Sequence, residues 1–139
     1  MSRRLLTLGA ANGLLSVLLR AFGAHVLRAR LDLYHYEVYQ TAVHYQGLHA
    51  LALLTTGLLA LHLDSRWLGR AGWFFSAGLL LFCGSLYLLA LFSARPLGLI
   101  TPLGGLLLLA GWGALLGAVR GGAWRSGGAP RQARDATGE

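Results

Sequence analysis

Four apolar blocks, each close to the length that crosses a bilayer, dominate this sequence. They cover approximately residues 5–27, 41–63, 71–93 and 97–119. About 20 consecutive apolar residues span the hydrocarbon core as a helix, and a segment in lipid must pair its own backbone groups, which a helix does. We therefore expect an all-α protein, an integral membrane antiparallel bundle of four transmembrane helices within residues 1–119.

Charged residues are too few for a soluble domain of this size. They make up 12% of the 139 residues, the hydrophobic fraction is 55%, and the mean hydropathy is +0.57, whereas soluble domains carry about 25% charge. Residues 120–139 are rich in Gly, Ala and Arg and lack apolar periodicity. We expect them to form a disordered cytoplasmic tail.

The arginines predict the orientation of the helices. Positive residues in short loops mark the cytoplasmic side of a membrane. With four spans, eight arginines fall on the side of both termini: Arg3, Arg4, Arg66, Arg70, Arg120, Arg125, Arg131 and Arg134. The opposite side holds Arg28, Arg30 and Arg95. We therefore predict a multi-pass protein of a bacterial inner membrane with both termini in the cytoplasm. The net charge of +7 follows from this topology, and nucleic acid is not an expected partner.

Polar side chains enter the second apolar block along one face. At about 100° per residue, Tyr45, Gln46 and His49 lie on the same side of a helix. Polar groups inside a bilayer are costly, face the protein interior, and suggest a functional site. Counting along antiparallel helices collects such groups in the outer half of the bundle and leaves the inner half apolar apart from a few residues such as Asn12. The expected polar cluster is Arg20, His25, Gln40, Thr41, Tyr45, Gln46, His49, Ser85, Tyr87 and Thr101.

Glycines spaced four apart predict close contacts between helices. Gly9 and Gly13 share a face of the first block, and Gly113 and Gly117 share a face of the last. Small residues at this spacing let neighbouring helices approach closely in a membrane. We expect these faces to meet another helix of the chain, a second copy of it, or a partner membrane protein, with the lipid bilayer around them.

Arg20 is the one charge well inside an apolar block. A charged residue costs about 2.5–3.5 kcal/mol near the centre of a membrane helix. Since Arg20 lies on the small-residue face with Gly9 and Gly13, we expect its guanidinium to turn into the bundle. Glu37, in the outer loop at residues 28–39, is the predicted partner that would hold this loop onto the helices.

Four motifs identify a family. They are Ala21-Phe22-Gly23-Ala24-His25; Gln40-Thr41-Ala42 with Tyr45-Gln46 and His49; Gly84-Ser85-Leu86-Tyr87; and Thr101-Pro102-Leu103-Gly104-Gly105 with Gly111-Trp112. In this order they resemble the signature of the domain of unknown function 423, which comprises small bacterial inner-membrane proteins and the animal transmembrane protein 256. The resemblance implies a four-helix membrane protein and brings no established activity. The chain departs from the pattern at Arg20, where a small residue is typical, and His44 occupies a variable position.

The sequence contains no recognisable catalytic or cofactor-binding pattern. His25, His44 and His49 do not predict a metal site, because His44 points about 140° away from His49 and no cysteine or carboxylate is spaced to complete four ligands. No nucleophile–base pair, nucleotide-binding loop or haem motif is present. We expect no enzyme activity, no metal and no cofactor. Two functions remain open: a non-enzymatic structural or assembly role through the glycine-rich faces, and binding or translocation of a small or lipidic ligand through the polar cluster.

Overall fold

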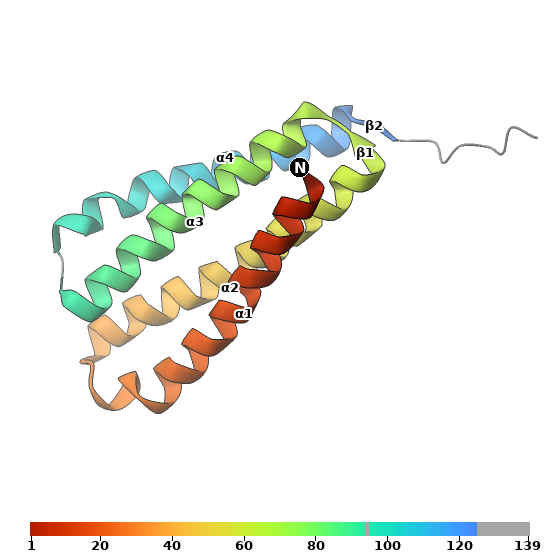
Figure 1. Cartoon of the computed structure of the whole chain (residues 1–139). Helices are drawn as coiled ribbons and strands as arrows, with labels where there is room; N and C mark the ends of the chain where they lie inside the picture. Colours follow the sequence, from red (N-terminus) through yellow and green to blue (C-terminus); the bar gives the residue numbers. More distant parts are fainter. Residues whose placement is uncertain (94, 125–139) are drawn as a thin grey trace, which may run out of the picture.

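The computed structural model describes residues 1–93 and 95–124, and four long helices make up most of them (Figure 1). The helices are α1 (Ser2–His25), α2 (Leu33–His62), α3 (Arg66–Phe92) and α4 (Thr101–Gly121). The 3-10 helices η1 (Leu27–Ala29) and η2 (Arg95–Leu99) lie between them. The two-residue strands β1 (Leu63–Asp64) and β2 (Ala123–Trp124) pair antiparallel. The expected all-α fold is confirmed.

Consecutive helices pack against one another and run in opposite directions. α1 packs on α2, α2 on α3, and α3 on α4. The N-terminus and the β1–β2 pair lie at one end of the molecule, and η1 and η2 lie at the other (Figure 1). We call the end with η1 and η2 the η end.

Three segments have the length and hydropathy of membrane spans: Ser2–Ala29, Arg66–Phe92 and Pro96–Gly121. α2 is not among them although it has 30 residues, because polar side chains lower the hydropathy of its first half. Apolar side chains also cover the outside of the molecule, for example Leu14, Leu51, Leu80 and Leu109. This leucine-rich surface fits a lipid environment.

The core lies where α2 and α3 meet, with α1 and α4 packed on either side. Leu53 and Thr56 of α2 are fully buried, as are Leu68 and Phe75 of α3. The Thr56 hydroxyl donates to the Ala52 carbonyl oxygen one turn earlier at 2.7 Å. A threonine can therefore be buried in this core without an unpaired hydroxyl.

The outer loop is shorter than the sequence predicts, because α2 begins at Leu33. Asp32 caps this helix: its Oδ1 accepts a hydrogen bond from the backbone N–H of His35 at 2.9 Å. An aspartate in this position satisfies a helix N–H that has no partner within the helix. The predicted loop at 28–39 therefore ends at Asp32, and its second half forms the first turns of α2.

The last helix differs from its predicted bounds at both ends. α4 begins at Thr101, after η2, so Pro102 lies in its first turn, where a missing N–H costs nothing. At the other end, α4 continues to Gly121, and β2 pairs with β1 through Trp124. Regular structure thus continues past the predicted start of the tail at residue 120. Residues 125–139 of the predicted tail lie outside the described residues.

Gly9 brings α1 close to α2, as predicted. A methyl group added at Gly9 would lie 2.9 Å from the Ala50 carbonyl oxygen, closer than real Cβ contacts. Gly13, one turn later, is looser, because the same addition would lie 3.9 Å from Ala50 Cβ. The close approach is therefore centred on Gly9.

The prediction of a close contact at Gly113 and Gly117 is wrong for the helices of this chain. No described atom lies within 4 Å of a methyl group added at Gly113, and at Gly117 the nearest is the Trp67 ring at 3.8 Å. α4 instead meets α3 through Gly104 and Gly111; a methyl group at Gly104 would collide with the Phe82 backbone. Gly113 is two residues beyond Gly111, about 200° around the helix, and so faces outward.

Candidate functional site

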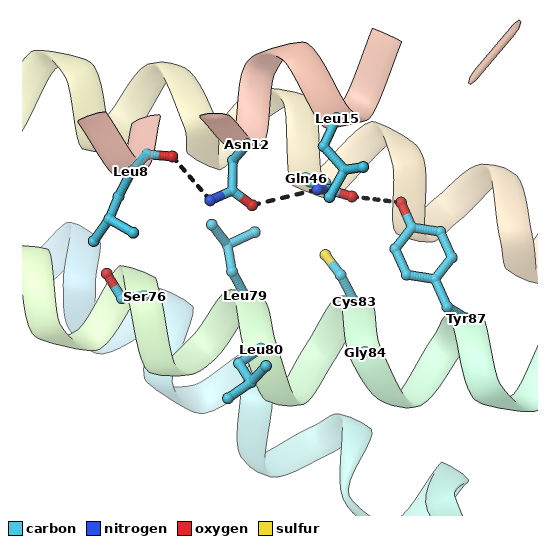
Figure 2. Close-up of a pocket in the computed structure, with 10 residues that line it drawn as sticks. All are labelled: Leu8, Asn12, Leu15, Gln46, Ser76, Leu79, Leu80, Cys83, Gly84 and Tyr87. Atoms are coloured by element: carbon cyan, nitrogen blue, oxygen red, sulfur yellow. Dashed lines mark hydrogen bonds between the residues drawn. The ribbon is translucent and has the colours of Figure 1, made fainter. Parts of the chain in front are cut away.

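A chain of hydrogen bonds crosses the middle of the molecule from α1 through α2 to α3 (Figure 2). Gln46 Nε2 donates to Asn12 Oδ1 at 3.3 Å, and the Tyr87 hydroxyl donates to Gln46 Oε1 at 2.6 Å. Asn12 Nδ2 donates to the Leu8 carbonyl oxygen at 2.9 Å, which completes the chain. Gln46 is only 4% exposed. Both ends of its buried amide are therefore paired, each with a different helix.

A cavity of about 260 Å³ lies beside this chain. Figure 2 shows Leu79 and Cys83 of α3 on one side of it and Leu15 of α1 on the other. Its lining is mostly hydrocarbon, and its amide and phenol groups already bond to one another. The cavity therefore offers apolar contact rather than free polar groups.

His49 uses both ring nitrogens to join α2 to α4. Its Nδ1 lies 2.8 Å from the Tyr45 carbonyl oxygen, and Trp112 Nε1 donates to its Nε2 at 3.2 Å. A carbonyl only accepts, so we assign the proton to Nδ1 and the lone pair to Nε2. The Phe75 ring lies 5.7 Å away and the Tyr45 ring stacks at 5.8 Å. Since His49 is 2% exposed and both of its ring nitrogens are paired, it is an interhelical link.

Ser85 and Thr101 form a third link, between α3 and α4. Their hydroxyl oxygens lie 2.7 Å apart, and Ser85 Oγ donates to the Phe82 carbonyl oxygen at 3.0 Å. Since the Ser85 proton is used in that bond, Thr101 is the donor to Ser85. A backbone acceptor thus orients both hydroxyls.

Arg20 does not pair with Glu37, and that prediction is wrong. Arg20 Nη1 donates to Gln40 Oε1 at 3.4 Å, and Gln40 Nε2 donates to the Tyr36 hydroxyl at 2.8 Å. Among the described residues no carboxylate lies within ion-pair distance of Arg20. Arg20 and Glu37 are both exposed. Because Glu37 belongs to α2 and not to a loop that folds back, its position is fixed on the outer side of that helix.

The predicted polar residues do not form one cluster. His25 is exposed, and the Thr41 hydroxyl donates to the Glu37 carbonyl oxygen of its own helix. Most of the others divide into separate links between pairs of helices, and the Tyr45 ring stacks on that of His49. Counting residues along a helix locates Cα atoms, but a helix has several faces and each packs against a different neighbour. Groups at similar depth on different faces therefore do not meet.

Three contacting residues were not in the predicted cluster. Counting along the helices puts Asn12 in the inner half of the bundle, but its side chain reaches Gln46. The sequence feature that could have identified it is an amide within an apolar block. Trp112 belongs to one of the four family motifs, and the sequence does not predict a hydrogen bond for its indole. No sequence feature singles out Tyr39 except its position just before the second apolar block. Its hydroxyl donates to the Leu19 carbonyl oxygen at 2.7 Å, and its ring fills the space beside Gly23, where a methyl group would lie 2.6 Å from Cε1.

At the η end, Asp32, His35 and Ser93 lie in the order of a hydrolase triad. His35 Nδ1 lies 2.7 Å from Asp32 Oδ2, and His35 Nε2 lies 3.3 Å from Ser93 Oγ. The hydrogen bond from the His35 backbone N–H, followed by that from its side chain, lowers the pKa of Asp32. Asp32 is the helix cap, and none of the cavities described here is lined by these residues. We therefore interpret the group as a cap that ties α2 to the end of α3.

The paired motif residues and the apolar helices define a class, the small helical membrane proteins. A family model described as a protein of unknown function (DUF423) matches residues 19–105. The chain is 40% identical over 120 residues to the UPF0382 inner membrane protein YgdD of Escherichia coli (strain K12), covering 86% of this chain and 92% of that protein. It is 44% identical over 108 residues to the UPF0382 membrane protein YwdK of Bacillus subtilis (strain 168), covering 76% and 86%. No solved structure matches the chain. The chain belongs to the DUF423 family, in agreement with its motifs.

Proposed function

We propose that this protein is a non-enzymatic structural or assembly component of a bacterial inner membrane. One observation carries the proposal: among the described residues, no buried side-chain nitrogen or oxygen lacks a hydrogen-bond partner. Buried polar groups without a partner are rare in folded proteins, and a catalytic role is one explanation for them. Here Gln46, His49 and Ser85 bond to side chains of neighbouring helices, so we assign them the role of holding the helices in register.

The proposal includes four transmembrane helices with both termini in the cytoplasm. α2 packs between α1 and α3, and its Gln46 and His49 are buried among them. A helix whose polar groups bond to neighbouring helices can cross a bilayer in spite of a lower hydropathy. The excess of arginines on the side of the termini supports the orientation.

Cysteine labelling tests this topology. In a Cys83→Ala background, Leu33→Cys places a thiol at the η end, where Leu33 is 73% exposed, and Ser126→Cys places one in the sequence after β2. An impermeant thiol reagent added outside intact cells should label Leu33→Cys alone. Labelling of Ser126→Cys from outside would overturn the orientation.

The assembly role is assigned to the outer face of α4. Gly113 and Gly117 are free of close contacts within the described chain, and small residues at this spacing suit a second membrane helix. In the same Cys83→Ala background, a thiol cross-linker should join Gly113→Cys to a second copy or to another membrane protein. Leu14→Cys, also exposed but on α1, is the matched control. Equal or absent cross-linking at both positions would remove the assembly role.

The second candidate function is the binding of a lipidic ligand. A cavity of about 650 Å³ between α2 and α4 favours it, and small-molecule sites typically occupy about 300–1,000 Å³. Leu48, Phe82, Leu106, Leu109 and Trp112 give this cavity a hydrocarbon lining. We call it the α2–α4 groove.

A further inference from the structure

The polar groups with unused bonding capacity lie near the η end of the molecule, outside the buried links. Arg20 of α1 and the facing side of α2 border an open surface cavity of about 560 Å³. Its lining residues are Arg20, Ala24, Tyr36, Gln40, Thr41, His44 and Tyr45. We call this space the Arg20 cavity.

The Arg20 cavity is rich in hydrogen-bond donors. Arg20 uses one of its five N–H groups on Gln40. The Tyr36 hydroxyl accepts from Gln40 Nε2, so its own proton is available. The exposed ring of His44 and the hydroxyl of Tyr45 add further donors. A guanidinium surrounded by such donors matches the oxygens of a phosphate, with which arginine forms paired hydrogen bonds.

The surrounding charge also favours an anion. No carboxylate lines the Arg20 cavity. Asp32 already accepts two hydrogen bonds from His35. Glu37, the nearest acid on α2, is exposed and one helical turn before Thr41. The exposed Arg28 and Arg30 lie in the turn at the same end. Arg20 is therefore a cation without a nearby counter-ion among the described residues.

The Arg20 cavity lies next to hydrocarbon-lined space and shares lining residues with it. His44 and Tyr45 line both this cavity and the α2–α4 groove. Arg20 and His44 also border a smaller cavity of about 350 Å³, which extends along Val17, Leu48 and Leu51. A ligand that occupies these neighbouring cavities together would have a polar end and a long apolar part.

The depth of Arg20 suits a lipid headgroup. It lies five residues before the end of α1 at His25, which is about 8 Å along the helix axis. A long arginine side chain at that depth reaches the level of the lipid phosphates. Basic residues at this level attract anionic lipids.

We propose that the Arg20 cavity binds the phosphate of an anionic phospholipid, one acyl chain of which lies in the α2–α4 groove. Arg20 supplies the positive charge, and the side chains of Tyr36 and His44 donate further hydrogen bonds to the phosphate oxygens. Trp112, which lies between the α2–α4 groove and the core, packs against the acyl chain of the lipid. The proposal deepens the lipidic-ligand candidate and is independent of the assembly role, which the α4 cross-linking experiment tests separately.

Quenching of Trp112 fluorescence tests the proposal, because this indole lines the groove. The full-length chain carrying Trp67→Phe, Trp73→Phe and Trp124→Phe keeps Trp112 as its one tryptophan. It is reconstituted into phosphatidylcholine bilayers that contain brominated-chain phosphatidylglycerol or, in parallel, brominated-chain phosphatidylcholine. The proposal predicts stronger quenching by the anionic lipid, with an affinity ratio of about fivefold for one cation at the lipid surface.

Two variants test which residue causes the preference for the anionic lipid. Arg20→Gln should lower the affinity ratio to about one, since it removes the charge that we assign to it. Arg66→Gln, at the other end of the bundle, is the matched control and should leave the ratio unchanged. Free inorganic phosphate should not reduce the quenching, because the acyl chain contributes to binding.

Three results would overturn the proposal. Equal quenching by the two brominated lipids would mean that only surrounding bilayer lipid reaches the groove. An unchanged preference of the Arg20→Gln variant for the anionic lipid would mean that another residue attracts this lipid. Competition by inorganic phosphate would indicate a phosphate site without a lipid.

Discussion

The chain Asn12–Gln46–Tyr87 allows a direct test of whether its polar groups stabilise the helix contacts. Tyr87→Phe removes the 2.6 Å bond to Gln46 Oε1 and leaves the rest of the ring in place. Hydrogen bonds between membrane helices average about 0.6 kcal/mol and reach about 1.7 kcal/mol. We expect a loss near the upper value, because the bond is short and its acceptor becomes an unpaired buried oxygen.

Gln46→Leu should cost more. It leaves both the Tyr87 hydroxyl and Asn12 Oδ1 without the Gln46 partner, and each unpaired buried group costs about 1–3 kcal/mol. The expected loss is therefore about 2–6 kcal/mol for this single change. The double variant with Tyr87→Phe should be less destabilised than the sum, since the phenylalanine has no hydroxyl left to pair.

The assay is the free energy of unfolding of the purified protein in mixed micelles, measured by denaturant titration. Tyr34→Phe is the matched control, because Tyr34 is 60% exposed, and it should change the stability by less than about 0.5 kcal/mol. Strict additivity of Gln46→Leu and Tyr87→Phe would refute the reasoning, because it would mean that the two side chains do not interact.

Three further predictions follow from particular contacts. Gly104→Ala should destabilise the protein by about 1–3 kcal/mol through overpacking against Phe82, whereas Gly113→Ala should be neutral or stabilising by up to about 1 kcal/mol. Arg20→Gln should change stability by less than about 1 kcal/mol, since the bond of Arg20 is long and exposed. The His35 amide NMR shift should titrate with a midpoint below 3.8, the ordinary pKa of the Asp32 carboxyl, which the structure lowers.

A specific result would contradict each of these predictions. Equal costs at Gly104 and Gly113 would contradict the assignment of the α3–α4 contact. A large loss in Arg20→Gln would mean that a stronger partner exists. A lowered pKa means that Asp32 stabilises the folded state above pH 3.8 and that this contribution disappears as the pH falls through the folded value. Asp32→Asn keeps a helix cap and should abolish the titration of the His35 amide.

The helices could be predicted from the sequence because the bilayer fixes their length. The apolar blocks correspond to α1–α4, although the fourth block begins four residues before the helix, within η2. Most of the buried face of α2 was also predictable: Gln46 and His49 are buried as the helical periodicity requires, whereas Tyr45, expected on the same face, is 37% exposed. Burial in a membrane protein separates polar from apolar faces strongly enough for one sequence to reveal it.

The contacts between helices could not be predicted in the same way. Gly104 and Gly111 meet α3 closely, whereas Gly113 faces outward and Gly117 makes only a loose contact with Trp67, although the spacing of the second pair follows the small-residue rule. Spacing identifies a face on its own helix and says nothing about how that helix is rotated against its neighbours. Glu37 failed as a partner of Arg20 for a local reason, because the cap at Asp32 starts α2 earlier than hydropathy indicates.

The His49–Trp112 pair offers the most direct test that the buried polar groups are structural. The measurement is the ¹⁵N NMR spectrum of the His49 ring in the bilayer-reconstituted protein at neutral pH, together with the exchange rate of the Trp112 indole proton. The account predicts one tautomer, with the proton on Nδ1 and Nε2 accepting a hydrogen bond, and a Trp112 proton protected from exchange. A mixture of tautomers with a rapidly exchanging indole proton would contradict it, because His49 would then be free to serve a ligand or a proton.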